Sequence, residues 1–230
     1  MALILAIDTT MGACSAALMK EGHIIAERKE QRARGHVERL LPMIDELCDK
    51  VGIDIAIIEM IAVTIGPGTF AGVRIGLSAA KGIGLALNVP IIAVTTLEAL
   101  AFQFAQSDKN FEGNIAVAVD ARRSEIYLQC FEVKQGVITE TSKAEAVPFD
   151  LVERGIGENV SLLIGSGSNL LGGLGKIVLP GFDHPNAAFV AQIAAQNGDR
   201  AKSCDDVSPL YLRAPDAKKP APLEMIVTDG

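Results

Sequence analysis

An internal duplication is the feature that most constrains how this chain can fold. One apolar run of strand length ends at Asp8, and another ends at Asp120, 112 residues later. Each is followed by a second apolar stretch and a glycine turn, at Gly22 and at Gly136, which lie 114 residues apart. Continuous apolar runs separated by turn residues predict buried strands. The sequence therefore predicts one structural plan used twice.

Two stretches between the predicted strands have helical periodicity. Residues 36–51 carry apolar side chains at i, i+3, i+4 and i+7 spacing, and residues 70–87 form a second apolar helix after a Gly-Pro-Gly-Thr turn. Further elements are expected as strands at 60–65, 90–94 and 160–164 and as a helix at 97–105.

The duplication predicts a first lobe at residues 1–106 and a second lobe at 107–213, with a polar linker at the boundary. Residues 214–230 contain three prolines and no apolar period, so we expect an extended tail. Two lobes whose first strand ends in Asp resemble the actin, hexokinase and Hsp70 nucleotide-binding fold. In that fold the two Asp turns face each other across a cleft and hold nucleotide phosphates and magnesium. The predicted fold class is α/β, with two duplicated lobes of this (ASKHA-like) type.

Composition excludes several classes of protein. Hydrophobic residues make up 49% of the 230 residues and mean hydropathy is +0.31, which excludes bulk disorder. The net charge of −7, with 4% aromatic residues and no Trp, argues against nucleic-acid binding by the chain's own surface. Four scattered cysteines predict reduced thiols. We expect no targeting segment and no membrane span, and hence a cytoplasmic protein.

Asp8, Thr9 and Thr10 have the right chemistry for a phosphate site, since hydroxyls and turn amides donate and a carboxylate can hold a hydrated metal. The alternative is that Asp8 only caps its own turn. The Gly-Pro-Gly-Thr turn at 66–69 could receive an anion, or could be a sharp turn with Thr69 as the helix N-cap. A second loop, with Gly165 and Gly167, is equally ambiguous.

Residue groups for catalysis are missing from the sequence. The three histidines, His23, His36 and His184, are far apart, and there is no H-x-x-x-H, no H-E-x-x-H and no G-x-S-x-G pattern. We therefore expect no catalytic residue and no bound metal.

The helix at 70–87 has more apolar surface than one core needs. Its polar side chains Arg74, Ser78 and Lys81 form a narrow stripe, and its four interior glycines should each cost about 1 kcal/mol relative to Ala. Close packing must offset that cost. Either the helix is enclosed within one large lobe, or its second apolar face packs against another protein.

Five blocks resemble the bacterial TsaB (YeaZ) family, and they follow the family order over nearly the whole chain to residue 213. They are LAIDTT at 5–10, HVERLLP at 36–42, GPGTFAGVRIG at 66–76, DARRSEIY at 120–127 and PLYLR at 209–213. Thr69 and Ala71 stand where the family usually has Ser and Thr, which weakens any claim that hydroxyl groups there bind phosphate.

The resemblance implies a role that the residues alone do not show. The family is similar in fold to TsaD, a metal-dependent, nucleotide-binding enzyme that transfers a threonylcarbamoyl group to adenosine 37 of tRNAs reading ANN codons. TsaB lacks TsaD's paired metal-binding histidines; it pairs with TsaD through the helices of its first lobe, and TsaE, an ATPase, joins the pair. Members also form homodimers through the same face.

By this resemblance we expect a non-catalytic activating subunit that contacts tRNA only within the complex. The expected partner interface consists of Gly72, Ile75, Gly76, Ala79, Ile83 and Met43. We expect no cofactor beyond weak binding of ATP or ADP at Asp8, Thr9, Thr10, Gly165 and Gly167. The alternative is an independent ATPase or small-molecule kinase of the same fold. An older label assigns this superfamily to the peptidases, but this sequence contains no metal site or nucleophile set that would support that label.

Overall fold

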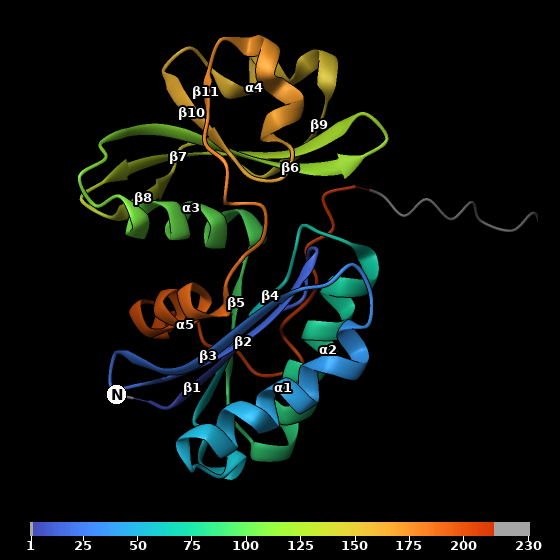
Figure 1. The fold of residues 1–230 in the computed structure, drawn as a ribbon, viewed down its shortest axis with the longest axis vertical. Coiled ribbons are helices and arrows are strands. Elements are labelled where there is room, and N and C mark those ends of the chain that lie inside the picture. Colours follow the sequence, from blue (N-terminus) through green and yellow to red (C-terminus); the bar gives the residue numbers. More distant parts are fainter. Residues whose placement is uncertain (1, 214–230) are drawn as a thin grey trace, which may run out of the picture.

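Two mixed β-sheets, stacked one above the other with helices between and outside them, make up the computed structural model of residues 2–213 (Figure 1). The first sheet has five strands in the order β3-β2-β1-β4-β5, with bounds Ile4–Asp8 (β1), Ala13–Lys20 (β2), His23–Gln31 (β3), Met60–Thr64 (β4) and Ile91–Val94 (β5). The second has six, of which five run in the order β8-β7-β6-β10-β11 while β9 also pairs with β7. Their bounds are Gly113–Arg122 (β6), Glu125–Lys134 (β7), Val137–Glu140 (β8), Glu145–Pro148 (β9), Val160–Ile164 (β10) and Ile177–Val178 (β11).

Both sheets have the same topology. In each, the first three strands form an antiparallel meander, and two later strands add in parallel on the other side of the first strand. The predicted duplication is confirmed, and the fold class is the duplicated α/β type of the actin, hexokinase and Hsp70 group.

The repeated glycine turns are equivalent two-residue hairpins. Lys20 pairs with His23 across the first, and Lys134 pairs with Val137 across the second. Both central residues have positive φ in each turn, at 52° and 84° in the first and 53° and 77° in the second. A Gly at the second position suits such a turn, whose twist matches that of the flanking strands.

Helices pack on both faces of the first sheet. Of the two helices between the sheets, each packs mainly on the sheet that is formed by the other half of the sequence. Helices α1 and α2 pack on the outer face of the first sheet, and α4 packs on the outer face of the second. Between the sheets, α5 packs on the first sheet, whereas α3 packs mainly on the second (Figure 1). Their bounds are His36–Val51 (α1), Phe70–Leu87 (α2), Thr96–Ser107 (α3), Val152–Ile156 (α4) and Ala187–Gln196 (α5), with short 3-10 turns at Ile55–Ile57, Phe149–Leu151, Ser168–Leu174 and Gly198–Arg200.

The chain returns to the first sheet at its end. Lys202 bridges to Ile91 of β5, and the N–H of Leu210 donates to the carbonyl of Ile65 just after β4. A linear division at residue 106 separates the two sheets but assigns α5 and the segment after it to the sheet on which they do not pack. The predicted tail, 214–230, lies outside the described residues.

Candidate functional site

Asp8 ends β1, and its carboxyl group is fully buried. Three donors meet on Oδ1: the hydroxyls of Thr64 and Thr10, at 2.6 and 2.7 Å, and the backbone N–H of Thr10, at 3.2 Å. Within residues 2–213, Oδ2 is buried and has no hydrogen-bond partner. Burial raises the pKa of Asp8, against the effect of the hydrogen bonds and the charge of Lys29. Asp8 caps its own turn through the Thr10 N–H bond, and its contact with a nucleotide stays a prediction.

The start of α2 lies directly on this turn. The Thr69 N–H donates to the carbonyl of Thr10 at 2.8 Å, and the Thr9 hydroxyl donates to the carbonyl of Gly72 at 2.6 Å. A Cβ added at Gly72 would lie 2.1 Å from the Thr9 carbonyl oxygen, and one at Gly76 would lie 2.7 Å from the Thr9 hydroxyl. Two of the four costly glycines in α2 therefore serve this close approach. Thr69 caps the helix by accepting from the Gly72 N–H, which confirms the N-cap interpretation.

The other side of the Asp8 turn is filled by the chain as well. Met11, at the tip of the β1–β2 hairpin, packs into the core formed by α3 and the second sheet. At the next position, a Cβ on Gly12 would lie 3.0 Å from the ring of His184. The Lys29 ammonium donates to the His184 carbonyl at 2.8 Å. The tip of the β1–β2 hairpin is thus packed closely against other parts of the chain.

Gly165 and Gly167 lie after β10 and pack on the end of β6. A Cβ at Gly165 would lie 2.4 Å from the carbonyl oxygen of Ala118, and the Gly167 N–H donates to the same oxygen at 2.9 Å. None of the hydrogen bonds within residues 2–213 joins this loop to the Asp8 turn. Nucleotide binding by Asp8, Thr9, Thr10, Gly165 and Gly167 stays a prediction.

The described chain offers little for covalent or metal chemistry. Among residues 2–213, no group of three or more His, Cys, Asp or Glu side chains is arranged to hold a metal ion. His36 is buried at the start of α1, and His23 is exposed on β3. Burial raises the pKa of Cys14 to about 11, so its thiol is protonated at neutral pH and is a poor nucleophile.

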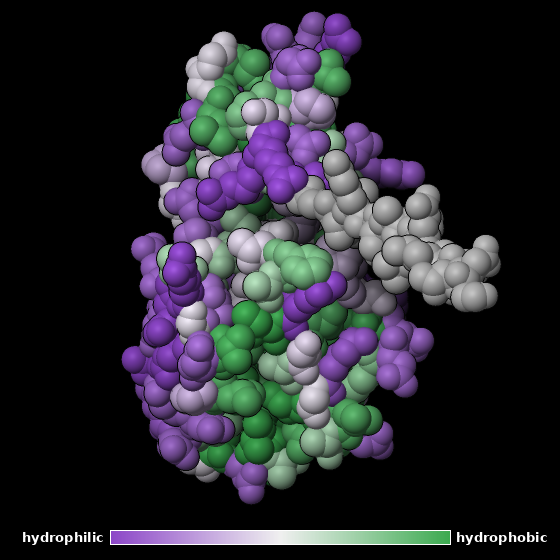
Figure 2. Space-filling view, turned by 90° about the vertical axis from the view of Figure 1, so that its right-hand side faces the viewer, coloured by the Kyte–Doolittle hydropathy of each residue, from purple (hydrophilic) through white to green (hydrophobic). Residues whose placement is uncertain are grey.

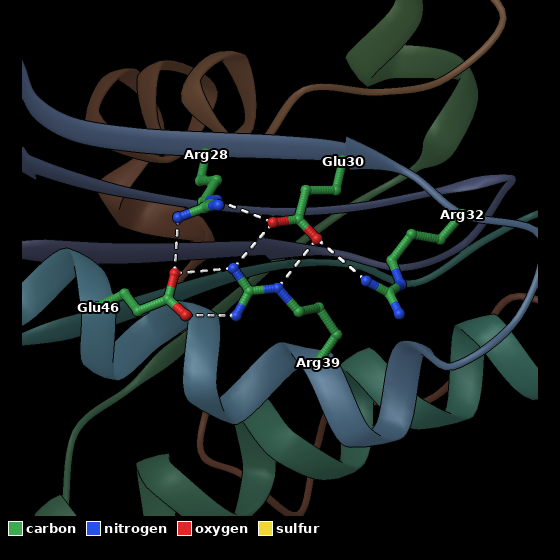
Figure 3. Close-up of polar contacts among 5 residues, drawn as sticks. All are labelled: Arg28, Glu30, Arg32, Arg39 and Glu46. Carbon is green, nitrogen blue, oxygen red and sulfur yellow. Dashed lines mark hydrogen bonds and ion pairs between the residues drawn. The ribbon is translucent and has the colours of Figure 1, made fainter.

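Five charged side chains fix α1 against the edge strand β3 (Figure 3). The Arg39 guanidinium contacts Glu30 at 2.8 Å and Glu46 at 2.7 Å, while Arg28 and Arg32 also pair with Glu30. The hydrogen bonds from Arg39 are the main reason why the pKa of Glu30 falls to about 2. The network turns one flank of α1 toward β3, which leaves the opposite flank next to α2.

On α1, that opposite flank is apolar and exposed. Val37 and Leu41 lie about 160–200° around the helix from Arg39. Leu41 is 52% exposed. The sequence carries a signal for this exposed flank, because the apolar positions of α1 span about 160° of arc, more than a stripe that only faces a sheet needs. The helical periodicity at 36–51 predicts α1 but does not show that Val37 and Leu41 lie at its surface.

On α2, the flank facing away from Tyr211 is formed by Ile75, Ala79 and Ile83, which are partly exposed and pack at the border of the core beneath α1. We call the surface formed by Val37, Leu41, Ile75, Ala79 and Ile83 the α1–α2 seam. Figure 2 shows apolar side chains gathered on this face of the molecule, bordered by hydrophilic ones. By length and composition alone α2 could cross a membrane, but its inner face packs on the sheet as a core helix does.

Three residues expected at the interface lie beneath the surface instead. Met43 is fully buried in the core under α1. Gly72 and Gly76 are buried against Thr9. A bulky substitution at Gly76 would therefore test folding and not association. The remaining three, Ile75, Ala79 and Ile83, form part of the seam.

Known proteins with similar sequences share this architecture. The family model described as "TsaD: tRNA N6-adenosine threonylcarbamoyltransferase" matches residues 22–162. The TsaB protein of Buchnera aphidicola is 30% identical over 222 residues, covering 91% of this chain and 97% of that protein. The solved structure of YeaZ from Pseudomonas aeruginosa superposes with a TM-score of 0.81 at 30% identity, covering 92% of this chain and 100% of that one.

Other relatives match at higher sequence identity but over a shorter length. The TsaB protein of Escherichia coli is 38% identical over 144 residues, which is 63% of this chain and 61% of that protein. The matches to the Haemophilus influenzae and Bacillus subtilis proteins span 51% and 58% of their lengths. This chain spans 51–61% of the length of these three relatives, at 36–38% identity, and 97% of the Buchnera protein. It belongs to the TsaB (YeaZ) family of tRNA threonylcarbamoyladenosine biosynthesis proteins.

Proposed function

We propose that this protein is the non-catalytic activating subunit of a complex that forms N6-threonylcarbamoyladenosine at position 37 of ANN-decoding tRNAs, and that it binds a TsaD-type transferase through the α1–α2 seam. The exposed apolar seam is the observation that carries the proposal. Apolar side chains gathered on two adjacent helices are typical of a surface that another protein covers.

A pair of helices is the partner structure that best fits the seam, because side-chain ridges of one helix pair pack into the grooves of another. The TsaD family model matches residues 22–162, a range that includes both α1 and α2. A TsaD-type chain should therefore have related helices to present. In the absence of the transferase, a second copy of this chain covers the same seam.

The remaining parts of the proposal follow from family membership and charge. A TsaE-type ATPase joins the pair, and the complex works in the cytoplasm. With a net charge of −7, this chain meets tRNA only within the complex, where the other subunits supply the phosphate contacts. Binding of ATP or ADP at the Asp8 turn is weak, since the carboxyl group there is buried.

A transfer assay tests the role. Threonylcarbamoyl transfer to unmodified tRNA is measured with this protein alone, with the TsaD-type transferase alone, and with both, given TsaE and threonylcarbamoyl-adenylate. We expect activity only with both proteins. Transfer by this chain alone would show that it is itself an enzyme. Equal activity with and without it would contradict the activating role and favour an independent ATPase or kinase.

A matched pair of variants tests the surface. Leu41→Glu places a charge in the seam, and we expect it to weaken transferase binding by about 10- to 100-fold. Leu170→Glu makes the same change at a leucine of equal exposure, 53% against 52%, on the second sheet's outer side. Isothermal titration should show full affinity for Leu170→Glu. Equal loss in both variants, or in neither, would contradict the assignment of the seam.

A further inference from the structure

Residues 209–213 connect the first sheet to the second in a way that the proposed function does not use. The Leu210 N–H donates to the Ile65 carbonyl at 2.8 Å, so the segment runs beside the end of β4. A Cβ at Gly66 would lie 2.9 Å from the Leu210 carbonyl oxygen, and Gly66 has φ +107°, so a side chain is excluded there. In Figure 1 this segment, the red end of the described chain, runs beside α2 toward the second sheet.

Tyr211 anchors the segment on the start of α2. Its ring stacks on Phe70, with centroids 5.8 Å apart and an interplanar angle of 25°. The Arg74 Nε donates to the Tyr211 hydroxyl at 2.9 Å, and its guanidinium lies 3.6 Å over the Phe70 ring. Stacking and a cation–π contact restrain three exposed side chains that would otherwise be mobile.

Arg213 anchors the segment on the second sheet, two residues later. Its guanidinium donates to the Ala121 carbonyl at 3.2 Å and pairs with the Glu125 carboxylate at 2.9 Å. These two partners stand on either side of the turn between β6 and β7, so one side chain holds both ends of that turn.

The turn that Arg213 holds is strained. Arg122, Arg123 and Ser124 have φ of 63°, 55° and 62°, three consecutive left-handed residues without a glycine. Such residues are unfavourable for L-amino acids and persist where surrounding contacts determine them. The Asp120 side chain supports the turn from inside by accepting from the Arg122 N–H at 2.8 Å. Arg213 supports it from outside.

We propose that residues 209–213 are a strap that couples the β6–β7 turn of the second sheet to the start of α2. Tyr211 and Arg213 are its two anchors, and each stabilises the contact that the other makes, because only Leu212 separates them along the chain. A change at either anchor is therefore felt at both ends. The strap links the second sheet to α2, the helix that carries three of the five seam residues.

Hydrogen exchange of the isolated full-length protein, followed by mass spectrometry, tests the strap. Arg213→Gln removes the positive charge, and with it the ion pair to Glu125 and the guanidinium bond to the Ala121 carbonyl. We expect amides of residues 121–126 to exchange about three- to tenfold faster, and amides of residues 66–74, which Arg213 does not touch in the contacts above, to exchange faster as well. Tyr211→Ala should produce the same two changes from the other anchor, and Tyr211→Phe, which keeps the ring, a smaller version of them.

The control is Arg28→Gln, which breaks ion pairs of similar length to Glu30 on β3 and to Glu46 on α1 and should leave both regions unchanged. The double variant Arg213→Gln, Tyr211→Ala should be little worse than the more severe single variant, since the anchors act together. The proposal is overturned if Arg213→Gln affects only residues 121–126 and Tyr211→Ala only residues 66–74, or if the two effects add in full.

Discussion

At the Asp8 turn this protein buries polar side chains, whereas at the α1–α2 seam it exposes apolar ones. The Asp8 carboxyl group is enclosed, and its Oδ1 accepts hydrogen bonds from the hydroxyls of Thr10 and Thr64. Leu41 and Val37, in contrast, are more than half exposed. A buried polar group whose partners belong to the same chain serves the fold. An exposed apolar surface that nothing among residues 2–213 covers calls for a partner.

Helix α2 takes part in both regions, so the buried polar turn and the exposed apolar seam can be compared on one helix. Its inner face is reduced to glycine where it meets the Asp8 turn, and its outer flank keeps isoleucine and alanine where it meets solvent. The same helix therefore has one face whose shape is fixed by the fold and another whose chemistry is available for binding. Variants on the two faces should separate stability from association.

The largest effect is expected where α2 meets the turn. Gly72→Ala would place Cβ 2.1 Å from the Thr9 carbonyl oxygen, a backbone atom that cannot move without shifting β1 or α2. We expect a loss of roughly 3 kcal/mol or more in the free energy of unfolding, as for other overpacked cores. Urea denaturation measures it.

The matched control lies in the same helix. A Cβ at Gly82 meets nothing within 4 Å, so Gly82→Ala should stabilise the protein by up to about 1 kcal/mol through helix propensity. If Gly72→Ala were tolerated as well as Gly82→Ala, the close packing of α2 on the Asp8 turn would be wrong.

On the outer face, association should change and stability should not. Val37→Glu changes an exposed seam residue, and we expect about tenfold weaker binding of the transferase. Leu85→Glu changes the most exposed leucine of α2, 77% exposed, near the end of the helix and outside the seam. Its effect on affinity should be smaller. A larger effect at Leu85 than at Val37 would move the binding surface to the C-terminal end of α2.

The sequence predicted the fold better than the site. Duplicated aspartates and glycine turns are local signals, and they located two sheets of one topology. The sequence does not indicate that α3 packs on the second sheet and α5 on the first, because an apolar helix has the same sequence pattern whichever sheet it covers. The sequence around Asp8 is the same whether the residue binds phosphate or caps a turn, and its burial and its bond from the Thr10 N–H become known only from the structure. Met43 has the periodicity of a helix face, but which arc of α1 faces out is decided by how the helix packs on the first sheet.

A moderate effect is expected from the polar cluster itself. Thr64→Val removes the shortest hydrogen bond to Asp8 Oδ1 and should cost about 1–2 kcal/mol of unfolding free energy at pH 7. Asp8→Asn tests the charge. Because burial raises the pKa of Asp8 in the folded protein, the unfolded chain releases the proton first, and the stability that Asp8 contributes falls as pH rises above about 3.8.

Asp8→Asn should therefore remove part of the decline in unfolding free energy between pH 4 and pH 7, measured by urea denaturation across that range. The same variant should leave transferase affinity unchanged, because Asp8 lies in none of the seam contacts. An Asp8→Asn protein with unaltered pH dependence but lost complex formation would show that the turn has a binding role.

The smallest effect concerns Glu30, which fixes the flank of α1 opposite the seam and has the reverse dependence on pH. Its pKa is lowered to about 2, mainly by Arg39, so it contributes stability above its unfolded value of about 4.5 and loses that contribution as pH falls through about 2. Glu30→Gln should lower the unfolding free energy by about 1 kcal/mol at pH 6, a modest amount because the network is partly exposed. It should also reduce the decline in unfolding free energy as the pH falls below about 4.5. Glu132→Gln, an exposed strand carboxylate without an ion pair among residues 2–213, is the control and should do neither. An identical acid-side decline in the wild-type and Glu30→Gln proteins would mean that the network does not hold α1 in solution, and the seam that α1 completes would then lack its fixed position.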